Sequence, residues 1–137
     1  MPRIQQKDMF KRFLEWIKLK EKLHSKEHVP PLFKEGEIWW SYFGENVGTE
    51  INGKGDFLTR PIVVLKKYDR HSFLAIPLTT QSKEGTWFLT FTHNKKTQTA
   101  VLSQARIISY KRLKERVGKV DSIDYDNIKK AFLDLHK

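Results

Sequence analysis

The segment RPIVVLKKYDRHSFLAIPLTTQSK, residues 60–83, constrains the fold more than any other part of this sequence. The nearly continuous apolar run 61–68 predicts a strand. DRHS turns the chain, and the run 73–78 predicts a second strand that returns beside the first. Arg60 precedes this hairpin and Thr79–Thr80 follows it, so polar side chains stand at one end of a buried element. Packing alone does not require them there, which makes them candidates for function.

Short strands separated by polar turns continue through the rest of the chain. Aromatic and β-branched residues favour strands, and glycines gather in one loop before the hairpin. The expected elements are a strand over 38–43, the loop 44–56, two strands around a hairpin tip at 93–96, a strand over 104–109, and a basic helical turn followed by a strand that ends at Val120. Five or six short strands flanked by helices predict a mainly β (α+β) fold, a small closed or half-open barrel.

Both ends of the chain have the periodicity of amphipathic helices. Residues 8–24 predict an N-terminal helix, which the prolines of HVPP must end. The apolar stripe of this helix consists of Phe10, Phe13, Leu14, Ile17 and Leu23. The C-terminal helix over 121–137 has an apolar face made of Ile128, Ala131, Phe132 and Leu135. We therefore expect an added helix and linker over 1–34, whose stripe covers a core or a partner, and one barrel domain over 35–137.

The charge balance indicates the class of partner. Lysine and arginine number 26 against 16 acidic residues, a formal net charge of +10, which attracts polyanions such as RNA and DNA. An acidic protein partner would exploit the same charge. The chain has no cysteine, no apolar run long enough for a membrane span, and no apolar region of a secretory signal near its N-terminus. These features predict a cytoplasmic protein without a membrane partner.

Several common catalytic patterns are missing from the sequence. His24 and His28 are one helical turn apart but have no third ligand in view, so solvated histidines are the simpler interpretation and no metal site is predicted. There is no phosphate-binding GxxxxGK[ST] loop and no serine in a nucleophile elbow. We expect no cofactor.

Four blocks of the sequence, taken in order, resemble the MazF/PemK family of toxins from type II toxin–antitoxin systems. The blocks are GEIWWSYFGENVGTE, RPIVVL, AIPLTTQSK and AVLSQARIIS. The family pattern is G-D-[IV]-x-W-V-x-F, a loop with G-[ST]-E, then R-P-x-[VL]-V-[LI], a strand that ends in P-x-T-[TS]-Q, and later a Q-[IV]-R segment. The resemblance covers residues 35–137. It implies an SH3-like β barrel of five to seven strands that forms a homodimer.

The resemblance also implies an activity, the metal-free cleavage of single-stranded RNA at short sequences. The ribose 2′-OH attacks the phosphate and leaves a 2′,3′-cyclic phosphate and a 5′-OH, so the protein mainly supplies charge stabilisation and proton transfer. Arg60 matches the family arginine that faces the scissile phosphate, and a guanidinium is a fixed fork of donors for phosphate oxygens. Thr79 would add a hydroxyl hydrogen bond to this phosphate, with Thr80 and Gln81 as binding groups.

The general base has more than one candidate. Glu50 matches the acid of the family's G-[ST]-E motif, and a carboxylate beside Arg60 could accept the 2′-OH proton. The loop between these two residues is longer than in many family members, so the insertion could place Asp56 or Lys54 in the groove instead. Glu50 would then be an exposed loop carboxylate.

The resemblance assigns substrate binding to a later segment as well. Gln104 and Arg106 match the family's Q-x-R segment near the groove and the dimer interface, although Arg106 could also point outward from an ordinary strand. Trp39 and Trp40 cannot both face the core, because successive strand side chains point to opposite faces. One of them packs under the N-terminal helix, stacks a base or covers the dimer interface.

Two other functions fit a barrel of this kind. A gyrase-binding toxin of the CcdB type would act on a protein, and a non-catalytic nucleic-acid-binding barrel would keep the basic surface without needing Arg60 or Thr79. The RP and PLTTQ motifs together favour the ribonuclease. Its expected partners are single-stranded RNA and a cognate acidic antitoxin, whose charge would complement that of this chain.

Overall fold

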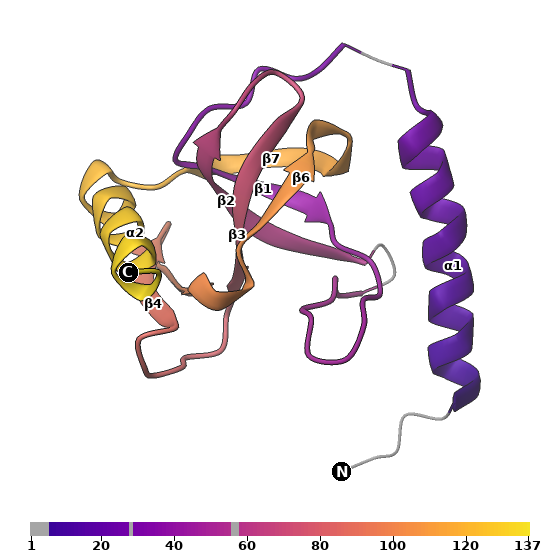
Figure 1. Cartoon of the computed structure of the whole chain (residues 1–137), viewed down its shortest axis with the longest axis horizontal. Coiled ribbons are helices and arrows are strands. Elements are labelled where there is room, and N and C mark those ends of the chain that lie inside the picture. The colour runs from indigo at the N-terminus through magenta and orange to yellow at the C-terminus, as the bar shows by residue number, and fades with distance from the viewer. Residues whose placement is uncertain (1–5, 28, 56–57) are drawn as a thin grey trace.

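The computed structural model describes residues 6–27, 29–55 and 58–137, in which seven strands are flanked by two helices (Figure 1). The helices are α1 (Gln6–Ser25) and α2 (Ser122–Leu135), with single 3-10 turns at η1 (Leu102–Gln104) and η2 (Tyr110–Arg112). The strands are β1 (Glu37–Tyr42), β2 (Thr59–Lys67), β3 (Ser72–Thr79), β4 (Phe88–His93), β5 (Lys96–Val101), β6 (Arg106–Ser109) and β7 (Leu113–Lys119). The mainly β fold with a helix at each end is confirmed.

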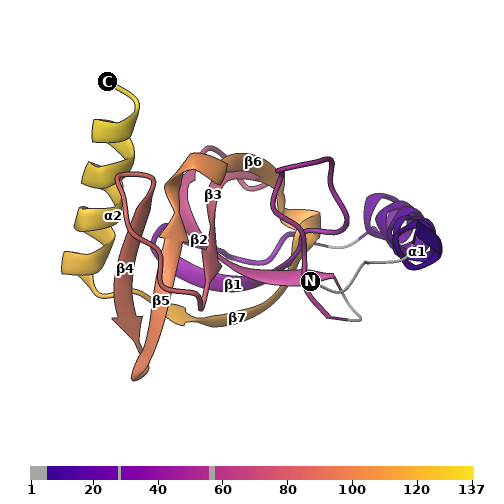
Figure 2. The same cartoon turned by 90° about the horizontal axis from the view of Figure 1, so that it is seen from below.

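The strands form one curved antiparallel sheet (Figure 2). Hydrogen bonds link them in the order β4-β5-β3-β2-β1-β7, and β6 pairs with β3 beside this path. Among the described residues no ladder joins β7 to β6 or to β4, so the sheet does not close. Of the two barrels that the sequence allowed, the half-open one is observed.

The hairpin expected from residues 60–83 is formed by β2 and β3. Ile62 pairs with Pro77, and continuing this antiparallel register by two residues places Arg60 opposite Thr79. On the other side of β2, Arg60 pairs with Ser41 of β1. The first residues of β2 and the last residues of β3 therefore meet at one edge of the sheet.

The central strands bury both faces, because the sheet has an apolar core on each side. Val63 and Leu65 of β2 face the core under α2, whereas Ile62 and Val64 face a second core. The first core also contains Ile38, Ile76, Leu78, Phe91, Ala100, Leu102, Val120 and Ile128. The second also contains Phe33, Trp39, Phe43, Phe73, Ala75, Ile108 and Tyr110. Burial on both faces explains why the β2 sequence is continuously apolar rather than alternating.

The C-terminal helix packs as its periodicity predicts. Ile128 is fully buried, and Ala131, Phe132 and Leu135 pack partly buried against the first core. The Tyr125 hydroxyl donates to the carbonyl of Leu65 at 2.7 Å, which fastens α2 to β2. Before α2, the expected basic helical turn is limited to η2, and β7 is longer than expected because it pairs along β1.

The N-terminal helix docks through a face that the sequence did not indicate. Trp16 is buried against Gly44, where an added Cβ atom would overlap the indole ring. The guanidinium of Arg12 pairs with the carboxylate of Glu45, and the guanidinium of Arg112 lies 5.5 Å from the Trp16 ring. A flat indole can approach the backbone here because Gly44 has no side chain.

The predicted apolar stripe of α1 does not contact a core. Phe10, Leu14 and Ile17 are exposed, and only Phe13 and Leu23 are half-buried. Figures 1 and 2 both show α1 at the edge of the molecule, across the sheet from α2. In the described part of the chain no helix is long and apolar enough to cross a membrane.

The two neighbouring tryptophans of β1 point to opposite faces, as strand geometry requires. Trp39 is buried in the second core, and Trp40 lines a cavity. The tryptophan that packs at the junction with α1 is Trp16 of the helix itself.

Glu37, the first residue of β1, is a buried carboxylate that joins three segments. Its Oε1 accepts from the backbone N–H of Lys34 at 2.7 Å and from the indole of Trp39 at 3.2 Å. Its Oε2 accepts from Nε of Arg116 on β7 at 2.6 Å. Burial acts to raise the pKa of Glu37, but the hydrogen bonds from Arg116, Lys34 and Trp39 outweigh it and lower the pKa below its ordinary value.

Candidate functional site

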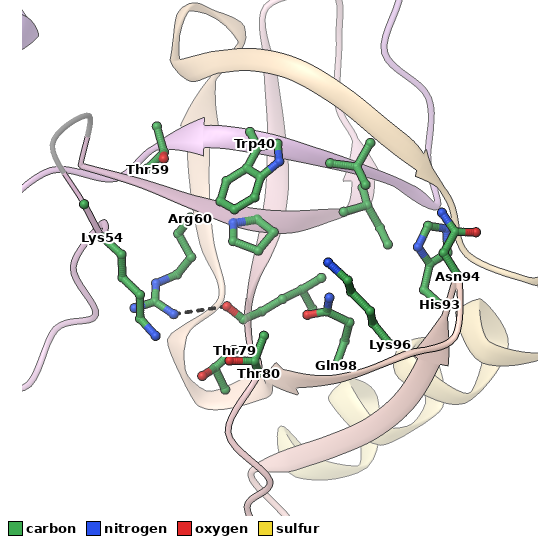
Figure 3. Close-up of a pocket in the computed structure, with 15 residues that line it drawn as sticks. Trp40, Lys54, Thr59, Arg60, Thr79, Thr80, His93, Asn94, Lys96 and Gln98 are labelled. Atoms are coloured by element: carbon green, nitrogen blue, oxygen red, sulfur yellow. Dashed lines mark hydrogen bonds between the residues drawn. The ribbon is translucent and has the colours of Figure 1, made fainter.

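A cavity of about 640 Å³ lies where β2 begins and β3 ends (Figure 3). Its polar lining residues come from the loop before β2, from both strands of the hairpin and from the β4–β5 hairpin; they are Lys54, Thr59, Arg60, Thr79, Thr80, His93, Asn94, Lys96 and Gln98. Figure 3 shows Arg60 and Lys54 with Thr79 and Thr80 at one end of the cavity, and His93 with Asn94 at the other end. The cavity therefore joins the sequence-predicted Arg60, Thr79, Thr80 and Lys54.

Arg60 is the buried cation of this cavity, with 6% of its surface exposed. Its Nε donates to the carbonyl of Asn52 at 2.7 Å, and its Nη1 donates to the carbonyl of Leu78 at 3.1 Å. Burial lowers the pKa of Arg60 from a value so high that the group stays charged. Among the described residues Arg60 has no acidic partner. A buried charge held only by carbonyls is costly, and an anionic ligand would compensate it.

Thr79 lies opposite Arg60 at the end of β3 and is also buried. Its Oγ1 accepts from the backbone N–H of Gln81 at 3.2 Å, so the hydroxyl hydrogen can still be donated to a ligand. Thr80 is exposed and lines the cavity. Gln81 is exposed and does not line the cavity, so this predicted binding residue is linked to the site only by the hydrogen bond from its backbone N–H to Thr79.

The loop between β1 and β2 holds the carbonyl that orients Arg60. Nδ2 of Asn46 donates to the carbonyls of Phe43 and Ile51, and Oδ1 of Asn52 accepts the N–H of Asn46 at 2.6 Å. The N–H of Gly53 closes the loop on the carbonyl of Gly44 at 2.8 Å. These bonds fix Asn52 beside the guanidinium. Asp56, an alternative base, lies outside the described residues.

Replacing Gly53 by alanine should disturb this loop. A Cβ atom at Gly53 would overlap the backbone carbonyl of Leu58, which cannot rotate away as a side chain could. We expect Gly53→Ala to lower the free energy of unfolding by about 1–3 kcal/mol, the usual effect of overpacking. Chemical denaturation would measure it.

Gly48→Ala is the matched control for the Gly53 variant. Gly48 lies in the same loop with a φ of +58°, but no atom lies within 4 Å of an added Cβ there. Gly48→Ala should lower the free energy of unfolding through backbone strain alone, by about 1 kcal/mol. Equal stability of Gly53→Ala and wild type would contradict the tight closure of the loop.

Glu50, Gln104 and Arg106 line a second cavity of about 390 Å³, away from Arg60. Oε1 of Gln104 accepts the N–H of Ile51 at 3.3 Å, and its Nε2 donates to the carbonyl of Thr49 at 3.2 Å. Glu50 is exposed and its carboxylate accepts the N–H of Val47 at 2.9 Å. The structure thus groups these three predicted residues together but does not bring Glu50 into the cavity of Arg60.

The lining also contains residues that the sequence did not single out as site residues. His93, Lys96 and Gln98 come from the β4–β5 hairpin, whose position depends on the pairing of β5 with β3. Oε1 of Gln98 is buried without a hydrogen-bond partner in the described structure. No described lining residue of this cavity is a carboxylate. No local pattern around residues 93–98 could have indicated this placement.

The chemistry of the first cavity suits an anionic ligand. Arg60 and Thr79 present donors at one end, and Lys54 and Lys96 add positive charge. Trp40 and Pro61 provide apolar surface beside them. In the part of the chain that the structure describes, no three His, Cys, Asp or Glu side chains could together hold a metal ion; His28 lies outside that part. The arrangement can bind a phosphodiester together with an apolar group.

Comparisons with known proteins identify the family and the fold. A family model of PemK-like, MazF-like toxins of type II toxin–antitoxin systems matches residues 34–136. MazF from Deinococcus radiodurans superposes with a TM-score of 0.60 at 16% identity, over 80% of this chain and 98% of that one. An endoribonuclease in complex with its cognate antitoxin, from mycobacterial species, gives 0.55 at 13% identity, over 73% and 90%.

A third similar structure is Mycobacterium tuberculosis toxin MazF-mt6, which gives a TM-score of 0.53 at 10% identity, over 73% of this chain and 95% of that one. A comparison with curated protein sequences gives no match. At such identities the superpositions show the fold alone.

Proposed function

Because the chain belongs to the PemK-like, MazF-like toxins of type II toxin–antitoxin systems, a family of endoribonucleases, we propose that it cleaves single-stranded RNA at a short sequence. In the proposed reaction no metal takes part. The 2′-oxygen bonds to phosphorus and loses its proton to a base, the bond to the 5′-oxygen breaks, and that oxygen takes up a proton from water. The products are a 2′,3′-cyclic phosphate and a 5′-OH. The observation that carries the proposal is the buried guanidinium of Arg60 in the first cavity, which has no acidic partner among the described residues.

Arg60 would stabilise the charge that develops on the phosphate. The carbonyls of Asn52 and Leu78 take two of the five N–H donors of the guanidinium, which leaves donors for phosphate oxygens. Both acceptors are backbone carbonyls, one in the β1–β2 loop and one in β3, so the guanidinium is oriented before substrate binds. Donors that are oriented in advance stabilise a developing charge most effectively.

Thr79 and the residues around it would bind the same phosphate. The Thr79 hydroxyl accepts from Gln81 and can donate its own hydrogen to a phosphate oxygen. Thr80 and Lys54 line the same end of the cavity, where a hydroxyl and an ammonium suit the sugar–phosphate backbone. Gln81 contributes by its backbone N–H.

Glu50 is our candidate for the base, and its placement requires a movement of the protein. Glu50 lines the second cavity with Gln104 and Arg106, whereas a base has to lie within hydrogen-bond reach of the 2′-OH beside the phosphate that Arg60 binds. The segment around Glu50 therefore has to move toward Arg60 when RNA binds. Gln104 and Arg106 would then hold the strand. A Glu50→Gln variant that cleaves at the wild-type rate would remove Glu50 from the reaction.

The partners and location follow from the family and the charge. We propose a homodimer in the cytoplasm, controlled by a cognate acidic antitoxin whose charge complements the net +10 of this chain. The mycobacterial structure, which contains an endoribonuclease with its cognate antitoxin, supports this partner.

The proposal is tested by incubating the protein with a long single-stranded RNA in excess EDTA and mapping the ends. We expect discrete cuts that end in cyclic phosphate, because the nucleophile belongs to the RNA. A matched oligonucleotide with one 2′-deoxy residue at the mapped site should remain intact. Cleavage of the deoxy oligonucleotide would refute 2′-OH attack, and salt-sensitive binding without cleavage would support the non-catalytic barrel instead.

A further inference from the structure

Helix α1 is an addition to the domain that the family model matches, because the match begins at residue 34. One face of the helix is already used. Arg12, Trp16, Leu19 and Leu23 recur at the four- and three-residue spacing of a single helical face, and all four are buried or half-buried. This face holds α1 against the loop after β1 and against η2.

The opposite face of α1 is apolar and uncovered. Phe10, Leu14 and Ile17 follow the same helical spacing and are 66%, 46% and 60% exposed. Isolated exposed apolar residues are common, but three on consecutive turns make a continuous surface. Within the described part of the chain, Figures 1 and 2 show no other helix or strand over this outer side of α1. The surface can therefore receive a partner without any rearrangement of the domain.

A row of lysines runs beside the apolar face. Lys11, Lys18 and Lys22 are all exposed and lie along one side of the stripe by their spacing. Nζ of Lys11 lies 4.0 Å from Oε1 of Glu15, an exposed pair that is weak enough for a partner's carboxylate to replace. Against the same face of a second copy, these lysines would meet lysines, which disfavours self-association through α1. Against an acidic surface they would form ion pairs around a buried apolar centre, the usual arrangement of an interface.

The length of the apolar face argues for a protein rather than a membrane. From Phe10 to Ile17 it spans about 10 Å at 1.5 Å per residue. Glu21, one turn after Ile17 on the same face, ends it with a carboxylate. Trp16, the residue best suited to a membrane interface, is buried against the domain instead. Two helical turns of apolar surface match a short helix of a partner.

We propose that the outer face of α1, defined by Phe10, Leu14, Ile17 and the row Lys11, Lys18 and Lys22, is a docking site for an acidic amphipathic helix of a partner protein. Leucine and similar apolar side chains of the partner's helix pack on the apolar stripe of α1, and the carboxylates of the partner's helix pair with the lysine row. The site lies outside both cavities and does not depend on cleavage of RNA, so its test is separate from that of the proposed function.

The test measures binding of a fluorescein-labelled, 21-residue synthetic helix with leucines on one face and glutamates on the flanks, by anisotropy with the full chain. We expect saturable binding that weakens as salt rises, and no binding of the same peptide with lysine in place of glutamate. The double variants Phe10→Ser/Ile17→Ser and Lys11→Glu/Lys18→Glu should each weaken binding at least tenfold. Circular dichroism and cleavage assays should be unchanged for both.

Matched controls come from α2. Leu133 is 61% exposed and Lys130 is exposed on that helix, so Leu133→Ser and Lys130→Glu repeat the changes in polarity and charge elsewhere. These variants should bind the acidic peptide as wild type does. Loss of binding in them, or equal binding by the α1 variants, would overturn the proposal.

Three further results would also overturn it. The first is that the acidic peptide does not bind wild type at all. The second is co-sedimentation with phosphatidylglycerol vesicles that Phe10→Ser/Ile17→Ser abolishes, in the absence of peptide binding, which would assign the face to a lipid surface. The third is concentration-dependent self-association that the same variant abolishes, which would make the face a contact between copies of this chain.

Discussion

Replacement of Arg60 by alanine should lower the rate of RNA cleavage by about 10²–10³-fold, the usual effect of removing a preorganised donor from a developing anion. The loss should appear in kcat, because the donors are aimed at charge that grows in the transition state. Single-turnover cleavage of a labelled RNA would measure it. Arg60→Lys keeps the charge but not the planar fork, and we expect it to recover only part of the rate.

The control for Arg60→Ala is a variant that removes one arginine charge elsewhere, on the surface. Arg70 is exposed in the turn between β2 and β3, so Arg70→Ala lowers the net charge equally without touching either cavity. It should cleave RNA at nearly the wild-type rate. Because Arg60 also bonds the carbonyls of Asn52 and Leu78, its variants need a thermal unfolding check. A folded Arg60→Ala protein that cleaves normally would exclude Arg60 from the reaction.

The second large effect is expected on stability, at Glu37. Glu37→Gln keeps the size of the side chain but removes the charge that accepts hydrogen bonds from Arg116, Lys34 and Trp39. Hydrogen bonds to charged groups contribute about 1.5–3 kcal/mol, and we expect a loss of that order in the free energy of unfolding. Urea denaturation at pH 7 would measure it, with the exposed Glu115→Gln on β7 as a control that should change little.

The pH dependence provides an independent check on Glu37. Its pKa is lowered in the folded protein, so folding favours the ionised form and the contribution is fully present above the ordinary pKa of about 4.3. It is lost as the pH falls through the lower folded-state pKa. Wild type should therefore lose stability below about pH 4 more steeply than Glu37→Gln, whose neutral amide does not titrate. Parallel curves for the two proteins would contradict the network.

Local patterns were sufficient wherever a feature depends on neighbours in the chain. The apolar runs on either side of DRHS predicted β2 and β3, and their antiparallel pairing places Arg60 and Thr79 together because both flank the same hairpin end. The spacing of apolar residues also predicted the C-terminal helix and the burial of Ile128 in the first core. In each case the residues concerned are close in sequence or joined by one turn, so few arrangements compete.

The apolar stripe of α1 shows where periodicity stops being informative. The periodicity favoured the stripe of Phe10, Phe13, Leu14, Ile17 and Leu23, because these apolar residues recur at offsets of three and four. The structure buries Trp16 instead, since the docking face is decided by the shape of the surface opposite, where Gly44 leaves room for an indole. That complementarity involves residues 28 positions apart and has no signature in the helix.

By itself the sequence determined a mainly β chain with a buried hairpin, a helix at each end, a basic surface, and the pairing of Arg60 with Thr79 at one edge. Only the tertiary structure decided that the sheet stays open, that the β4–β5 hairpin brings His93, Lys96 and Gln98 to the same cavity, and that Glu50 faces a separate one. The physical reason is range: strand pattern and turns are set by adjacent residues, whereas cavities are set by how distant segments pack.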